Sequence, residues 1–133
     1  MVLKLLIYLP SLPTLSGTFN NGSSVSDVSL SGNYAYLSSY SSGLEIIDIS
    51  NPSSPALIGT YNTPGDAYGI SVSGNYAFVA DWIEGLQIID ISNPFTPTLS
   101  SNYNTFSPYS FASGVSVNGN YAFVADMWDG LKI

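Results

Sequence analysis

One heptapeptide motif occurs three times in this chain and constrains its fold more than any other feature. It lies at residues 31–37 (SGNYAYL), 73–79 (SGNYAFV) and 118–124 (NGNYAFV). Counted from its glycine, the motif recurs after 42 and then 45 residues. A period near 40 residues is typical of solenoids, propellers and other repeat arrays. The chain is therefore expected to be a repeat protein.

Each repeat contains four short segments with the character of β-strands, which we call a to d. In the second repeat they are residues 68–72, 76–80, 86–91 and 97–100. Each is 4 to 8 residues long and is bounded by Gly, Asn, Asp or Pro, as short strands usually are. Gly74 allows a tight turn between a and b because glycine takes a positive φ without steric cost.

Four antiparallel strands in about 40 residues describe one blade of a β-propeller. The sequence therefore predicts an all-β fold, an arc of three four-stranded blades, with repeats at approximately 1–42, 43–84 and 85–133. The longer second period comes from three extra residues in the 104–111 loop, and insertions in repeat proteins map to loops on one face. A β-sandwich with a coincidental repeat is the alternative.

The repeated segments resemble a known family. Residues 69–81 (GISVSGNYAFVAD) and 85–97 (GLQIIDISNPFTP) are similar to the LVIVD-type β-propeller repeat, whose consensus is G-V-x-V-x-G-N-Y-A-Y-V-A-D and then G-L-x-I-I-D-I-S-N-P-x-x-P. The resemblance covers about nine tenths of the chain. It implies a propeller of the kind found in extracellular or cell-surface proteins, mostly without assigned activity. The first repeat departs from it at Asp27 and at residues 38–40 (SSY).

The composition excludes several classes of function. Two basic residues, Lys4 and Lys132, stand against nine acidic ones, and there is no His and no Cys. A nucleic acid partner needs clustered Lys and Arg, which this chain lacks. No apolar run approaches the roughly 20 residues that membrane insertion requires. Without His or Cys there is no Ser/His/Asp or Cys/His hydrolase and no usual zinc site.

Three blades cannot close a propeller ring, which normally holds 4 to 8. The third repeat stops inside strand c, at residues 130–133. We therefore expect a homodimer, because two arcs of three blades make a six-bladed ring with two-fold symmetry. Residues 1–9 then compete with 130–133 for strand c of the shared blade, with Met1 aligned to Gly43 in the 42-residue register. The alternative is that the chain is a fragment of a longer propeller protein.

A candidate ligand site lies where the d–a and b–c connections emerge, because in a four-stranded blade both leave at the same end. This end is variable, aromatic and acidic, whereas the repeated turns at the opposite end look structural. Aromatic rings with carboxylates suit a carbohydrate, a cationic peptide of a protein ligand, an ammonium ligand, or Ca²⁺. The candidate ligand-binding residues are Asp66, Tyr68, Asp81, Trp82, Glu84, Phe106, Tyr109, Asp126, Trp128 and Asp129.

A structural reading exists for several of these residues. Asp81 and Asp126 each precede a turn, where aspartate commonly accepts hydrogen bonds from backbone N–H groups. Trp82 and Trp128 can pack between blades.

Two functions remain open. The first is a non-catalytic binding or cell-surface interaction module that assembles into a ring. The second is a carboxylate-based enzyme, a hydrolase or lyase, with Asp27 and Asp66 at the axial mouth. An enzyme of that kind needs two convergent carboxylates with differently shifted pKa values.

Overall fold

The computed structural model describes residues 3–7, 13–104 and 110–133, and this part of the chain forms thirteen β-strands. It contains no helix, and so none that is long and apolar enough to cross a membrane. The prediction of an all-β fold is confirmed.

Two four-stranded antiparallel sheets form the middle of the chain, and in each the strands follow one another in sequence order. Both have the a-b-c-d order of a propeller blade. The strands of the first are β3 (Asp27–Ser31), β4 (Tyr34–Ser38), β5 (Leu44–Asp48) and β6 (Ala56–Tyr61), and those of the second are β7 (Gly69–Ser73), β8 (Tyr76–Ala80), β9 (Leu86–Asp90) and β10 (Thr98–Tyr103).

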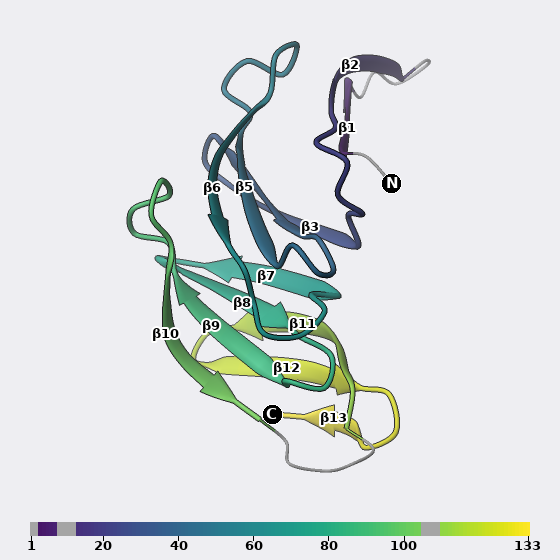
Figure 1. Cartoon of the computed structure of the whole chain (residues 1–133), viewed down its shortest axis with the longest axis vertical. Helices are drawn as coiled ribbons and strands as arrows, with labels where there is room; N and C mark the ends of the chain where they lie inside the picture. Colours follow the sequence, from purple (N-terminus) through teal and green to yellow (C-terminus); the bar gives the residue numbers. More distant parts are fainter. Residues whose placement is uncertain (1–2, 8–12, 105–109) are drawn as a thin grey trace.

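Two smaller sheets stand at the ends of the arc. The third repeat forms three strands, β11 (Ala112–Asn118), β12 (Tyr121–Asp126) and β13 (Gly130–Lys132). The N-terminal pair is β1 (Leu3–Ile7) and β2 (Thr14–Phe19). The described residues thus hold two complete blades and two partial ones, rather than three four-stranded blades. Figure 1 shows the four sheets following one another along an arc, with β6 and β10 on its convex side.

The N-terminal pair reproduces the c–d half of a blade. Leu3 lies opposite Phe19, as Leu44 lies opposite Tyr61 in the first complete blade. Both pairs also have a bulge after the third residue of strand c, and β9–β10 repeats it. The expected alignment of Met1 with Gly43 is one residue out of register, because the connection from β1 to β2 is one residue shorter than that from β5 to β6.

The hydrophobic core lies between consecutive sheets. Strands b and c of the two complete blades carry apolar side chains on both faces, because side chains alternate along a strand and each of these blades has a neighbour on either side. In β4, Leu37 packs toward β1–β2, while Tyr36 packs toward the second complete blade. A third cluster joins Leu86 of the second blade to Val124 of the third sheet. We call the face toward the following sheet the forward face and the other the backward face.

The innermost strands approach each other closely. A Cβ added to Gly69 would lie 2.7 Å from Cα of Gly114, so this contact requires glycine. Asp27 stands at the corresponding position of the first repeat, and its Oδ2 accepts a hydrogen bond from the Ile70 N–H at 3.1 Å. Ser29 Oγ similarly accepts one from the Val72 N–H at 3.0 Å. Side chains of the preceding blade therefore accept hydrogen bonds from backbone N–H groups on the inner edge of β7.

We predict that Gly69→Ala lowers the free energy of unfolding by about 1–3 kcal/mol, because the added methyl group overpacks the contact with Gly114. Urea denaturation measures the change. Ser71→Ala on the same strand is the control and should change the free energy by less than about 0.5 kcal/mol. Equal stability of Gly69→Ala and wild type would contradict the close approach.

Candidate functional site

The d–a loops and b–c turns meet at one end of the arc, as the strand order predicts. Tyr40, in the first b–c turn, forms a two-hydrogen-bond bridge with Ala67, at the start of the second blade. Trp82 forms the same bridge with Ala112 of the third sheet. Each b–c turn therefore holds the entry to the next blade, and we call this end of the molecule the loop end.

A buried carboxylate ties the loops together in the second blade. Asp81 is fully buried and accepts hydrogen bonds from Thr63 Oγ1 at 2.5 Å and from the Gly65 N–H at 2.9 Å. Both donors lie in the loop that leads from β6 to β7. Burial raises the pKa of Asp81, and the charges of Glu84 and Asp66 add to this against the hydrogen bonds. Its two oxygens are thus occupied within the protein.

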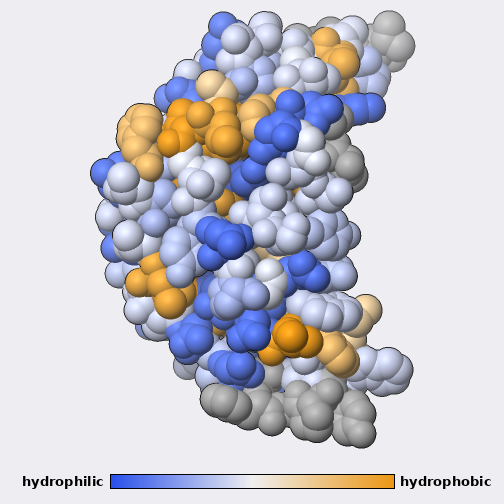
Figure 2. Space-filling model, in the orientation of Figure 1, coloured by the Kyte–Doolittle hydropathy of each residue, from blue (hydrophilic) through white to orange (hydrophobic). Residues whose placement is uncertain are grey.

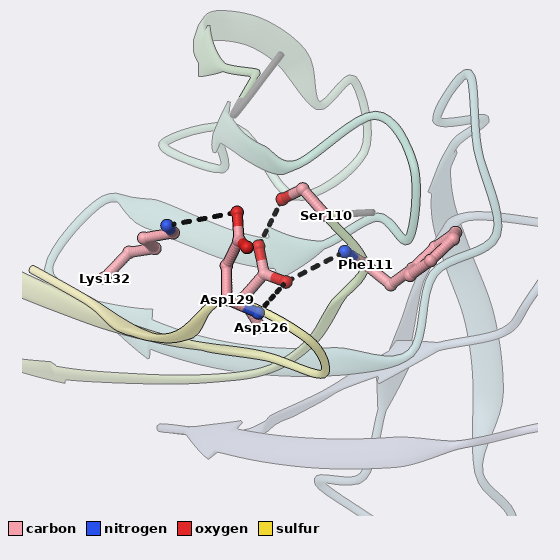
Figure 3. A network of polar contacts seen from close by, with 5 residues as sticks. All are labelled: Ser110, Phe111, Asp126, Asp129 and Lys132. Carbon is pink, nitrogen blue, oxygen red and sulfur yellow. Dashed lines mark hydrogen bonds and ion pairs between the residues drawn. The ribbon is translucent and has the colours of Figure 1, made fainter. Parts of the chain in front are cut away.

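Asp126 has the same role in the third repeat (Figure 3). Its carboxylate accepts hydrogen bonds from the Ser110 hydroxyl, the Phe111 N–H at 3.1 Å and the Asp129 N–H at 3.4 Å. Burial alone would raise the pKa of Asp126, but the hydrogen bonds from Ser110, Phe111, Asp129 and Trp128 outweigh it and leave the pKa below its usual value. The structural reading of both aspartates therefore accounts for their contacts.

The first blade reaches the same result with a different residue. Ser39 stands where the other repeats have aspartate, and its hydroxyl donates to Glu45 Oε2 of strand c at 2.7 Å. Glu45 Oε1 accepts from Asn21 and Ser23 of the preceding loop. The carboxylate has moved from the b–c turn to strand c. Sequence reasoning missed Glu45, although the replacement of aspartate by Ser39 signalled that another acceptor was needed.

Four aromatic rings form a continuous row across the loop end. Tyr40 meets Tyr68 edge to face with ring centroids 4.9 Å apart. Tyr68 stacks on Trp82 at 4.5 Å, and Trp82 contacts Phe111 at 4.8 Å. Tyr68 and Trp82 were among the predicted residues, whereas Tyr40 was not. All four side chains are half-buried, and their contacts link the first repeat to the third.

Two members of this row have strained backbones. Tyr40 has φ 40° and Trp82 has φ 51°, a left-handed conformation that bulky residues rarely adopt. The bridges to Ala67 and Ala112 hold them there. Strain of this kind, about 1–3 kcal/mol per residue, persists only where surrounding structure fixes it.

The structure places most of the predicted ligand-binding residues at the loop end. Asp66 and Trp82 line one shallow pocket of about 340 Å³, together with Ser41, Thr63 and Ile83. Glu84 and Asp129 lie in b–c turns, and Trp128 is 74% exposed. Phe106 and Tyr109 lie outside the described residues.

The two axial carboxylates do not form a free pair. Asp27 uses one oxygen for the Val28 N–H and the other for the Ile70 N–H. Asp66 lines the loop-end pocket beside Trp82. No cluster of three or more Asp, Glu, His or Cys side chains that could hold a metal ion occurs in the described part of the chain.

Sequence comparison assigns the repeats to a family. The model of the LVIVD repeat matches residues 22–63, 64–105 and 111–133, which together make up most of the chain. The chain belongs to the LVIVD repeat family. Each of the first two matches covers part of one d–a loop and one complete blade, and the third spans β11 to β13.

A solved structure shares the architecture of these LVIVD repeats. The crystal structure of the computationally designed Ika4 protein aligns with a TM-score of 0.50, covering 85% of this chain and 91% of that one at 10% sequence identity. At such low identity the likeness concerns the fold alone. No curated protein matches the sequence significantly.

The strained row predicts an unusual order of stabilities at Trp82. Trp82→Ala should lower the free energy of unfolding by about 1–3 kcal/mol, because it removes contacts with Tyr68 and Phe111. Trp82→Gly loses the same contacts but tolerates φ 51°, so it should be about 1 kcal/mol more stable than the alanine variant. Urea denaturation compares them, with the exposed Trp128→Ala as control. An alanine variant at least as stable as the glycine variant would rule out the strain.

Asp126 predicts a pH dependence of stability. Its pKa in the folded state is below that in the unfolded state, so ionised Asp126 stabilises the fold above about pH 4, and this stabilisation is lost as pH falls through the folded pKa. Asp126→Asn should lower the free energy of unfolding at pH 7 by about 1–3 kcal/mol, and its difference from wild type should shrink toward pH 3.

Asp129→Asn in the same turn is the control for this prediction. It removes the same charge but only a partly exposed ion pair with Lys132, so it should change the free energy by less than about 1 kcal/mol. Chemical denaturation at pH 3, 5 and 7 measures both variants. Equal effects of the two substitutions at pH 7 would show that the Asp126 hydrogen bonds contribute nothing specific.

Proposed function

We propose that this chain is a non-catalytic β-propeller module, and that its arc closes into a six-bladed ring with a second copy. The module binds a carbohydrate or protein ligand at the loop end of the ring, outside the cell or at its surface. The observation that carries the proposal is an uncovered apolar groove between β1 and β3. It has a volume of about 430 Å³ and is lined by Leu3, Leu5, Leu6, Val28 and Leu30, among others.

The groove lies where strands a and b of the N-terminal blade would pack. Val28 and Leu30 point to the backward face of β3, and they are 43% and 65% exposed. At the position of Val28 in the second blade, Ile70 is only 4% exposed, because the first blade covers it. Val28 and Leu30 thus occupy positions that a neighbouring blade covers elsewhere in the arc, but no described strand covers them here.

The same contrast occurs on both partial sheets. Leu6 of β1 corresponds in register to Ile47 and Ile89, which are fully buried, yet Leu6 is exposed. On the forward face of the third sheet, Leu131 is exposed, whereas the corresponding Leu86 is buried. Covering apolar surface contributes roughly 25 cal/mol per Å², so both sheets favour a partner. A second copy offers each sheet the complement that it lacks.

The non-catalytic part of the proposal rests on the state of the carboxylates. Asp27, Asp81 and Asp126 each accept at least two hydrogen bonds from the protein itself. Catalytic carboxylates must instead present an oxygen to a substrate. The pocket beside Asp66 and Trp82 supports a binding role, because an aromatic residue and an exposed acid line it together with the polar residues Ser41 and Asn62. Family membership and low charge support an extracellular or cell-surface location.

Light scattering coupled to size-exclusion chromatography tests ring closure. Wild type should have a mass of about 28 kDa, twice the 14.1 kDa of the chain. Leu30→Asp places a charge in the groove and should shift the mass to that of the monomer, since burying an unpaired charge is costly. Phe95→Asp is the control, because Phe95 is 63% exposed in a c–d turn away from the groove. A monomeric wild type, or a dimeric Leu30→Asp variant, would contradict the proposal.

A further inference from the structure

We infer that the dimer forms by strand exchange, in which β1 of one copy replaces β13 on the edge of β12 in the other copy, and Lys4 takes the place of Lys132. The inference rests on the proposed ring and specifies which strands build its shared blades. Its basis is that β1 and β13 are two versions of the same strand c.

The two strands match residue by residue. Leu131 and Lys132 pair with Ala125 and Val124, as Leu86 and Gln87 pair with Ala80 and Val79. Pairing with β2 gives Leu3 and Lys4 the same two places in strand c. The sequence Leu-Lys followed by an aliphatic residue thus occurs twice, at residues 3–5 and 131–133. The first copy belongs to the c–d half of a blade, and the second lies beside an a–b half.

In each described sheet that has a b–c turn, the second residue of strand c contacts that turn or its flanking residue. Glu45 accepts from Ser39 in the first blade, and Gln87 Nε2 donates to the Glu84 carbonyl at 2.9 Å in the second. In the third sheet Lys132 Nζ lies 3.4 Å from Asp129 Oδ2 (Figure 3). A lysine at this position therefore complements the acidic turn of the third repeat.

Both lysines of the chain occupy this one position. The b–c turn of the third repeat carries Asp126, whose carboxylate is hydrogen-bonded within the chain, and Asp129, which forms the ion pair with strand c. Lys132 supplies the cation of this pair from the same chain. Lys4 is exposed on β1, and no hydrogen bond or ion pair joins it to another described residue. Charge complementarity thus favours an ion pair between Lys4 of one copy and the acidic turn of the third repeat in another.

In the structure, β13 pairs with only part of the edge of β12. β13 is three residues long and pairs only with Val124, Ala125 and Asp126, so Tyr121 to Phe123 have no partner on that edge. Leu131 is 61% exposed and Ile133 is 75% exposed. By contrast, β1 has five residues and brings β2 with it as strand d. Exchange would therefore extend the pairing along all of β12.

The register of the exchanged pair follows from β8 and β9. Leu3, Lys4 and Leu5 should lie opposite Ala125, Val124 and Phe123 of the other copy, as Leu86, Gln87 and Ile88 lie opposite Ala80, Val79 and Phe78. The forward face of β12 would then cover the groove beside Val28 and Leu30. This is the packing that Tyr36 makes against Ile70 in the middle of the arc.

Disulfide trapping distinguishes the two occupants of the edge, since the chain has no cysteine of its own. Directly opposed residues on antiparallel strands are close enough for a disulfide. Under oxidation, the trapping variant, Ala125→Cys with Leu3→Cys, should give a covalent dimer on a non-reducing gel. The locking variant, Ala125→Cys with Leu131→Cys, should instead fix β13 within its own chain and give monomers, and reducing agent should restore the dimer.

Charge-reversing substitutions of the two lysines, neither of which is buried, provide a second test of strand exchange. Lys4→Glu sets a third acid against Asp126 and Asp129 and should raise the dimer dissociation constant about tenfold or more in sedimentation equilibrium. Lys132→Glu is the matched control, because it weakens only β13 and should leave the dimer as tight as wild type or tighter. Equal constants for Lys4→Glu and wild type would overturn the inference.

The two proposals fail in different ways. If wild type is a monomer, ring closure itself is wrong. If wild type is a dimer but the trapping variant stays unlinked, and the oxidised locking variant remains a dimer, then the ring closes without strand exchange. A linked dimer of the trapping variant together with a monomeric locking variant supports exchange.

Discussion

The packing of one sheet face on the next is the interaction on which this structure depends. No blade buries its own apolar side chains, because strands b and c are apolar on both faces. Tyr36 and Leu37 are neighbours in sequence, yet they belong to different cores, one on each side of the same sheet. Stability in such an array comes from interfaces between neighbours. The two partial sheets at the ends of the arc therefore leave apolar side chains exposed that the complete blades bury. Figure 2 shows the arc as a crescent with several separate hydrophobic patches on the face in view.

The carboxylates at the loop end serve this packing. Asp81 and Asp126 hold the chain as it passes from one blade to the next, and Glu45 does so from a different strand. Donors in the adjoining loop stabilise the charge of each carboxylate, so each blade orders the loop by which the chain enters it. The aromatic row above them adds ring contacts across the same joints.

Much of the fold could be predicted from the sequence, because the period and the turn residues are local signals. Gly74 has φ 56°, as the tight a–b turn required. The gathering of Tyr68 with Trp82 also followed, since strand order alone decides which loops share an end. The buried carboxylate of the first blade was harder to predict. Ser39 stands where the other repeats have the accepting aspartate, and Glu45 on strand c supplies the acceptor instead. Only the hydrogen bond between the two side chains reveals this replacement. Tyr40 was missed because its partner Tyr68 lies in another blade. The register of β1 was shifted by a shorter connection that the repeated motifs do not mark.

The short strand β13 has a consequence for the single chain in solution. An open strand edge with free N–H and C=O groups is a template for uncontrolled pairing and aggregation. β13 covers the half of β12 nearest the b–c turn, with a lysine at its end and few contacts behind it. Such a segment can open without the rest of the sheet, because local opening costs far less than global unfolding. If strand exchange occurs as proposed, β13 shields this part of the edge from unrelated strands until β1 of a second copy takes its place.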